Sequence, residues 1–229
     1  MHIYTEENIV YEYERVVADI DNLGGCSVTR KNKITARLES DPLFSKKLRL
    51  YGCRSFQFYA DKIGKNIEEL DPDKEFKITA RDVTSGVKLD SSTQIEGENK
   101  DVLVTNVHFD NPLTRGNSLE VEIEYHNLRV SFYLTSLWQE PHICEWFIKP
   151  DTQINEMEAT IKFPETLPDW FTKSEIGVSP IPQDWVRVGR HIDNGRPCVL
   201  LRASDLKVGI SYKVKIDAGK NLSKNAHCE

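Results

Sequence analysis

Alternation of apolar and polar residues is the strongest pattern along this chain. The clearest case is a seven-residue segment in which apolar residues alternate with glutamates: Leu119, Glu120, Val121, Glu122, Ile123, Glu124 and Tyr125. Residues two apart on a strand point to the same face, so this segment predicts a strand with one buried face and one face in water. A helix would spread the three glutamates across its apolar stripe. Residues 212–216 repeat the pattern with lysines in the polar positions.

Further strands are expected along the whole chain, in segments that alternate less strictly: 9–20, 26–38, 55–59, 75–81, 86–95, 102–109, 129–137, 143–149 and 159–163. The turn residues at 21–25 predict a hairpin between the first two of these strands. Helical signals are confined to 63–70, which Asp71 and Pro72 should end, and to a short turn at 167–173. Short strands separated by turn residues favour an antiparallel architecture over alternating strands and helices.

The composition supports the same fold class. Val, Ile and Thr supply 17, 18 and 13 residues, against 8 Ala and 2 Met, and β-branched side chains favour strands. We therefore predict an all-β, antiparallel β-sandwich protein with two immunoglobulin-like sandwich domains in tandem. The polar stretch 96–101 places the boundary, giving an N-terminal domain at 1–98, a C-terminal domain at 99–220 and a polar tail at 221–229. The alternative is that this stretch is a hairpin loop inside one continuous sheet.

Charge and cysteine content exclude several classes of protein. The net charge is −6 and the isoelectric point about 5.6, which argues against binding to nucleic acid or anionic lipid. No apolar stretch is long enough to span a bilayer, and the first residues do not form a signal peptide. Five cysteines without a CxxC pair indicate free thiols and a cytoplasmic location. Two basic stretches, 30–33 and 46–49, are interpreted as solvated strand faces and a turn.

Candidate metal sites are incomplete. His142 and Cys144 would share one face of a strand, and Cys198 or His126 could complete a zinc site. Asp71, Asp73 and Glu75 have the alternate spacing of a calcium loop but lack its central glycine and distal glutamate; a similar cluster lies at Asp19, Asp21 and Asn22. Both acidic clusters fit ordinary turns equally well. We predict no metal and no cofactor.

No catalytic motif occurs in the sequence. The chain has no G-x-S-x-G, no P-loop and no G-x-G-x-x-G, and 36 acidic residues cannot nominate a glycosidase pair by spacing alone. The expectation is a non-enzymatic binding or sensor module that recognises a protein partner or a small ligand through end loops. The alternatives are a hydrolase with a site between the two halves, and a carbohydrate-binding module that uses exposed tryptophans.

The candidate binding residues are Trp170, Phe171, Trp185 and Arg187. All four tryptophans of the chain fall between positions 138 and 185, and prolines at 164, 168, 180 and 182 interrupt the stretch around the last two. Aromatic and arginine side chains on loops stiffened by proline are typical of binding hot spots. The alternative is that these aromatic residues close one end of the core.

The second half of the chain also resembles a known class of modules. Its marks, in order, are Asn111-Pro112-Leu113, Gly116, the strand at 119–125, Ile161-Lys162-Phe163-Pro164, Trp185 and residues 209–214, Gly-Ile-Ser-Tyr-Lys-Val. This order resembles the β-sandwich accessory modules that follow effector or regulatory domains in bacteria, some of them in defence systems. The resemblance implies a sensing or interaction role and assigns no catalytic residue.

Overall fold

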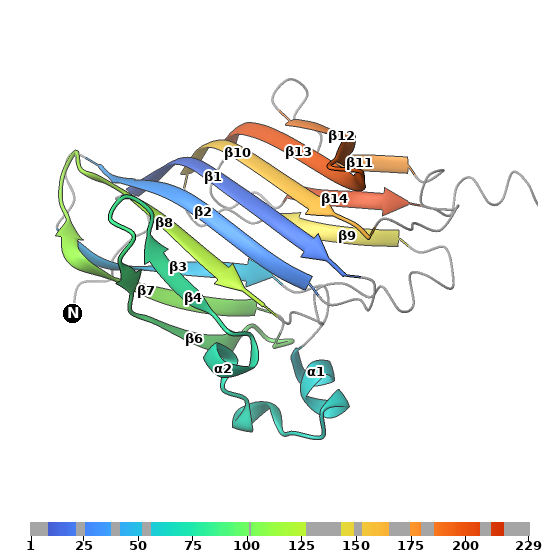
Figure 1. Ribbon diagram of the computed structural model, residues 1–229, viewed down its shortest axis with the longest axis horizontal. Helices are drawn as coiled ribbons and strands as arrows, with labels where there is room; N and C mark the ends of the chain where they lie inside the picture. Colours follow the sequence, from blue (N-terminus) through green and yellow to red (C-terminus); the bar gives the residue numbers. More distant parts are fainter. Residues whose placement is uncertain are drawn as a thin grey trace, which may run out of the picture.

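The structure is built almost entirely from β-strands. It is a computed structural model that describes residues 9–21, 26–37, 42–51, 56–100, 102–126, 143–148, 153–164, 175–179, 186–206 and 212–217. Figure 1 shows one large twisted sheet in front, two smaller sheets and a small helical region. The prediction of an all-β protein is confirmed. Within the described part of the chain, no helix has the length and apolar composition needed to cross a bilayer.

The large sheet has eight strands in the order β12-β13-β10-β1-β2-β8-β4-β5. Their bounds are β1 Ile9–Ile20, β2 Cys26–Ala36, β4 Thr79–Asp82, β5 Lys88–Leu89, β8 Ser118–Tyr125, β10 Gln153–Lys162, β12 Val186–Asp193 and β13 Arg196–Leu206. All pairs are antiparallel except β1 and β10, which run parallel from Val10 opposite Gln153 to Asp19 opposite Lys162. The predicted hairpin between β1 and β2 is present.

Two sheets of three strands complete the fold. One has the order β3-β7-β6, with bounds Leu43–Tyr51, Val102–Leu113 and Ser91–Glu96, and the other has the order β11-β14-β9, with bounds Glu175–Ser179, Tyr212–Asp217 and Ile143–Ile148. The first of these packs on the large sheet. Leu48, Leu103 and Val107 from it share one buried core with Ile34 and Ile123 of β2 and β8.

The predicted boundary between residues 98 and 99 falls in the connection between β6 and β7. These two strands pair with each other from Ser91 opposite Val107 to Glu96 opposite Val102. Strands from both sides of this position also pair in the large sheet, where β2 lies beside β8 and β1 beside β10. The tandem immunoglobulin-like arrangement is not confirmed by this topology.

The helical region differs from its prediction. Residues 56–59, expected to be strand, belong to helix α1, Phe56–Lys62. Phe56 and Ala60 are both fully buried and lie four residues apart, which is a helical spacing, and the Phe56 ring packs 5.5 Å from that of Phe76. The residues after it form a turn and a 3-10 helix at Ile67–Glu69. Asp71 and Pro72 do not merely end a helix, since they begin α2, Pro72–Glu75, as its N-cap and first residue.

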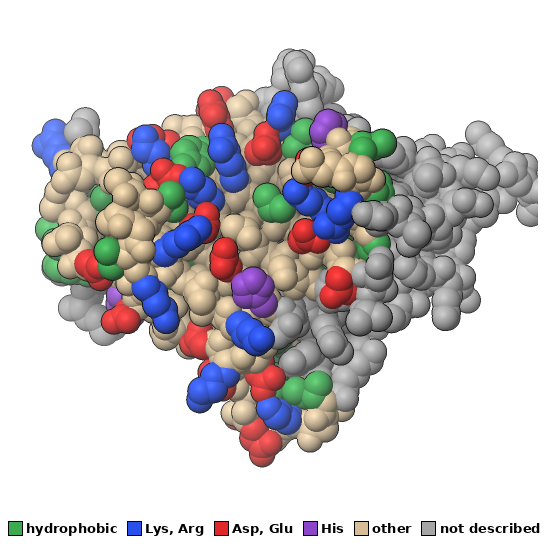
Figure 2. Space-filling view, viewed as in Figure 1, with side chains coloured by type: hydrophobic (Ala, Val, Ile, Leu, Met, Phe, Trp, Pro, Cys, Tyr) green, Lys and Arg blue, Asp and Glu red, His purple; other side chains and the backbone are tan. Residues whose placement is uncertain are grey.

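Strand β8 follows its prediction closely. Val121, Ile123 and Tyr125 are buried, and Leu119 is partly buried against the same core. Glu120 and Glu122 face outward, where they form ion pairs with Lys31 and Arg81. Figure 2 shows basic and acidic side chains intermixed over this outer face. The pairing of opposite charges across strands describes a solvated face.

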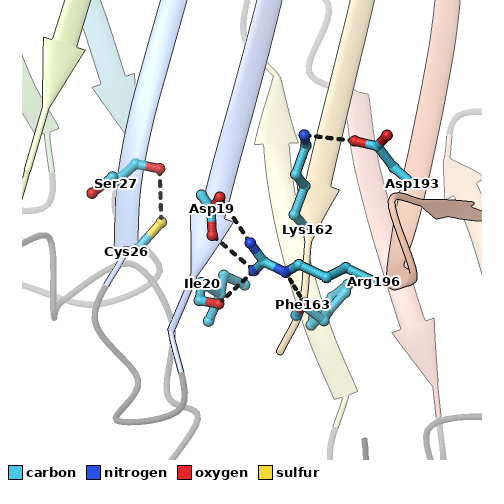
Figure 3. A network of polar contacts seen from close by, with 8 residues as sticks. All are labelled: Asp19, Ile20, Cys26, Ser27, Lys162, Phe163, Asp193 and Arg196. Carbon is cyan, nitrogen blue, oxygen red and sulfur yellow. Dashed lines mark hydrogen bonds and ion pairs between the residues drawn. The ribbon is translucent and has the colours of Figure 1, made fainter. Parts of the chain in front are cut away.

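An arginine joins the ends of β13, β10 and β1 (Figure 3). Arg196 follows a two-residue turn in which Asn194 and Gly195 have φ of 51° and 81°, as a type I′ hairpin requires. Its guanidinium donates to both carboxylate oxygens of Asp19, at 3.0 and 2.8 Å, and to the carbonyl oxygens of Phe163 and Ile20 at 2.9 and 3.0 Å. Arg196 therefore ties the parallel pair β1 and β10 to the hairpin.

Candidate functional site

The binding residues predicted from the sequence are not placed by the structure. Trp170, Phe171 and Trp185 lie outside the described residues, as do the strand at 129–137, the turn at 167–173 and the polar tail. Arg187 lies in β12, opposite Arg202 of β13, and only its backbone is described. The predicted surface around these residues stays a prediction.

A different set of polar side chains lies inside the molecule. The inward face of β2 is buried along its whole length and consists of Cys26, Val28, Arg30, Asn32, Ile34 and Ala36. Two polar residues thus occupy the middle of an otherwise apolar row, with Arg30 at 9% and Asn32 at 1% exposure. The interpretation of 30–33 as a solvated basic stretch is correct only for Lys31 and Lys33, which point outward and pair with glutamates. For Arg30 the interpretation is wrong, because its side chain is buried.

A bulge in β1 brings an acidic residue to the same place. Tyr11 lies opposite Ile34 and Tyr13 opposite Lys33, so Glu12 is an extra residue in β1. The extra residue reverses which side chains point inward, and Glu14 rather than Tyr13 turns toward the core. Glu14 is 4% exposed, and its Oε1 lies 2.5 Å from Nε of Arg30. The guanidinium also donates to the carbonyl oxygen of Arg49 over 2.7 Å.

The β3-β7-β6 sheet contributes further buried polar residues that face the large sheet. Lys46 of β3 is 6% exposed, and its Nζ lies 5.9 Å from the centre of the Tyr11 ring, a cation–π contact. Thr105 of β7 is fully buried and accepts a hydrogen bond from the hydroxyl of Tyr125 at 3.2 Å. Burial raises the pKa of Tyr125, an effect that the nearby Arg30 opposes. The interpretation of 46–49 as solvated is therefore wrong for Lys46.

We call Glu14, Arg30, Asn32, Lys46 and Thr105 the inter-sheet polar cluster. These are the buried polar and charged residues of the described part of the chain. They come from β1, β2, β3 and β7, and they lie between the large sheet and the β3-β7-β6 sheet. Burying an ion in a protein costs several kcal/mol unless partners compensate for the lost water. A cluster with three charged side chains is therefore unusual in a core built from valine, leucine and isoleucine.

Asn32 stands out within the cluster. Neither its Oδ1 nor its Nδ2 has a hydrogen-bond partner among the residues that the structure describes. It lies opposite Glu14 on β1 and opposite Val121 on β8. Asp73 presents a related case at the edge of the core, since its Oδ2 accepts from the backbone N–H of Thr93 while its Oδ1 has no described partner. Buried polar atoms without a partner are rare in folded proteins.

The metal sites considered from the sequence do not assemble among the described residues. No group of three histidine, cysteine, aspartate or glutamate side chains there is arranged to hold an ion. Asp71 caps α2 and pairs with Lys74, while Glu75 pairs with Lys65. The acidic spacing at 71–75 therefore belongs to a helix start rather than to a cation loop. His142 lies outside the description, and Cys144 is described only by its backbone.

One arrangement has the composition of a catalytic triad. The Ser27 hydroxyl lies 3.3 Å from Nδ1 of His126, and Nε2 of that histidine lies 3.7 Å from the Glu124 carboxylate. The second distance is too long for a hydrogen bond. The imidazole and the carboxylate are also 43% and 40% exposed, whereas a triad needs a buried acid that holds its histidine. This trio therefore does not supply an activated nucleophile.

Comparison with known proteins assigns no family. No family model and no curated protein matches the chain. Among solved structures, a protein thought to be a protease from Parabacteroides distasonis is similar over 92% of this chain and 40% of its own length, with 10% identity and a TM-score of 0.45. A protein from Legionella pneumophila, thought to bind nutrients, is similar over 93% of this chain and 68% of its own length, with 6% identity and a TM-score of 0.45.

A third similar structure is the M1 zinc metallopeptidase of Deinococcus radiodurans. It is 9% identical, with coverage of 92% of this chain and 42% of that protein, and the TM-score is 0.39. This chain thus spans about two fifths of the length of two of the three proteins. At TM-scores below 0.5, none of these similarities indicates what this chain does.

Proposed function

We propose that this chain is a binding module without catalytic activity of its own, and that it recognises a small polar ligand between its two main sheets. The observation that carries the proposal is Asn32, whose buried carboxamide has no partner among the described residues. A ligand that supplied one donor and one acceptor there would recover the free energy that burial takes from this side chain.

The rest of the cluster supports a site rather than a packing accident. Glu14, Arg30 and Lys46 are charged residues held at low exposure by strands of two different sheets. An apolar core would serve stability better, because replacing buried ion pairs by apolar residues is often neutral or favourable. Charged groups in costly buried environments are enriched at functional sites, and this enrichment favours a binding site here. The trio of Ser27, His126 and Glu124 lacks the geometry of a catalytic triad, so it does not compete with this interpretation.

The test is a thermal-shift screen of small molecules that includes nucleotides, sugars, organic acids and amides. It uses the wild type, Asn32→Leu and Asn106→Leu. Asn106 is a matched control because its side chain contacts His108 on the surface of β7. We expect at least one compound to raise the melting temperature of the wild type and of Asn106→Leu but not of Asn32→Leu. If no compound acts in an Asn32-dependent way, the cluster is structural and the proposal fails.

The binding surface expected from the sequence, on loops around Trp170 and Trp185, predicts a different result in this screen. If Trp170→Ala or Trp185→Ala abolishes the ligand-induced shift at nearly unchanged stability, the aromatic surface expected from the sequence is the binding site. A loss of about 3–5 kcal/mol in folding stability would instead place these tryptophans in the core.

A further inference from the structure

We infer that the ligand of the inter-sheet polar cluster presents a planar amide edge, as a carboxamide or a lactam ring does. This inference rests on the proposed function and narrows the class of ligand. It starts from Asn32, the cluster residue whose polar atoms both lack a described partner.

The chemistry of the side chain selects the complement. A carboxamide carries an acceptor oxygen and a donor NH₂ side by side in one plane. A second amide edge matches both at once with two parallel hydrogen bonds, as asparagine does with adenine in nucleic acids. A carboxylate would satisfy only the Nδ2 donor and would place a negative oxygen against Oδ1. An ammonium group would satisfy only Oδ1.

Arg30 and Lys46 give the inter-sheet polar cluster a formal net charge of +1, but the charged group directly opposite Asn32 is an acid. Glu14 lies directly opposite Asn32 on β1, and its carboxylate would repel an incoming carboxylate. Arg30, the nearest cation on the same face of β2, already contacts Glu14 and the carbonyl oxygen of Arg49. A neutral amide adds no charge to this arrangement and has less hydration to lose than an ion.

The neighbours on the inward face are apolar. Val121, opposite Asn32 on β8, is 1% exposed, and Ile34, two residues further along β2, is fully buried. Binding sites of this kind combine apolar walls with a few polar groups that fix orientation. A flat ring that carries an amide edge has both properties, which is why nicotinamide and uracil are suitable probes.

Access to the cluster imposes a kinetic signature. Asn32 is 1% exposed and lies on the inward face of β2, whose apolar residues share one core with the β3-β7-β6 sheet. A ligand can reach this carboxamide only when the two sheets separate locally, so association should be slow and should speed up in mild denaturant. Probes must therefore be incubated with the protein before each measurement.

The experiment compares matched amide and acid probes on the full chain. Nicotinamide, uracil and nicotinate are incubated with the wild type, Asn32→Leu, Asn32→Asp and Asn106→Leu, and melting temperatures are recorded. At a probe concentration about 100-fold above Kd, an amide probe should raise the melting temperature of the wild type and of Asn106→Leu by about 5–10 °C. It should have no effect on Asn32→Leu and a reduced effect on Asn32→Asp, while nicotinate should have no effect on the wild type.

The two proposals fail in different ways. If nicotinate stabilises the wild type as much as nicotinamide does, the site takes anions, and the amide inference is wrong while the proposed function stands. The amide inference is also wrong, and the proposed function again stands, if amide probes fail but another compound of the broader screen acts through Asn32. If nothing in either set depends on Asn32, both the inference and the proposed function are wrong.

Discussion

Replacing Asn32 by leucine should make the protein more stable. The two side chains have the same number of heavy atoms and branch at the same carbon, so leucine leaves no cavity, although its two methyl groups are bulkier than the planar carboxamide. The carboxamide is 1% exposed and unpartnered among the described residues. An unsatisfied buried polar group costs about 1–3 kcal/mol, and leucine removes this cost. We therefore expect a gain of about 1–3 kcal/mol in the free energy of unfolding.

Urea denaturation followed by intrinsic tryptophan fluorescence measures this gain. For a chain of this size, about 1 kcal/mol corresponds to a shift of roughly 2–4 °C in melting temperature, so a thermal melt gives an independent value. Asn106→Leu, on the surface of β7, should stay within about 0.5 kcal/mol of the wild type. A loss of stability greater than about 1 kcal/mol in Asn32→Leu would refute the reasoning, because it would mean that the carboxamide makes hydrogen bonds in the folded protein.

Three further predictions concern charged and titratable groups. Glu14→Gln and Arg30→Met should each lower the free energy of unfolding, measured by urea denaturation, by about 3–5 kcal/mol. The double variant should lose less than the sum of the two, because a single buried ion without its partner is less favourable than no ion at all. Additive losses would contradict this prediction. Arg196→Lys should lower the free energy of unfolding by about 1–2 kcal/mol, because lysine cannot make the two-pronged contact with a carboxylate. A melting temperature within experimental error of the wild type would show that the contacts of Arg196 with Asp19 do not contribute to stability. The pKa of Tyr13 is raised to about 12, mainly by burial and next by its hydrogen bond to Glu120. The contribution of Tyr13 to stability is therefore complete below pH 10 and is lost as the pH rises through about 12. An ultraviolet titration should find this pKa lowered in Glu120→Gln, and an unchanged value would exclude the hydrogen bond as a cause.

The strands were predictable where strict alternation coincides with local pairing. The hairpin of β1 and β2 and the alternation of β8 follow from neighbouring residues alone. The parallel pairing of β1 with β10 joins residues more than 140 positions apart, and no local pattern encodes it. Helix α1 was missed because Phe56 and Phe58 suggest a period of two, whereas the packing of Phe56 with Phe76 selects the helix.

Two of the five residues of the candidate site could be placed on the buried face from the sequence. Arg30 and Asn32 have the same parity as Val28 and Ile34, so strict alternation through β2 already places them on the buried face. The run of basic residues at 30–33 is by itself typical of a solvated strand face, so local charge and strand parity disagree here. Glu14 could not have been placed in the same way, because the bulge at Glu12 changes the parity of β1.

The bulge at Glu12 also explains why the cluster forms where it does. Without the extra residue, Tyr13 would point inward, and Arg30 would face the core with no carboxylate beside it. The unpaired guanidinium would then cost several kcal/mol, and the strand could keep its register only by losing the arginine. With the bulge, Glu14 meets Arg30, and the inward row of β2 can hold Asn32 next to a compensated pair. The charge of Arg30 is therefore compensated within the protein, while the carboxamide of Asn32 has no described partner, and the proposed recognition by this cluster rests on that difference.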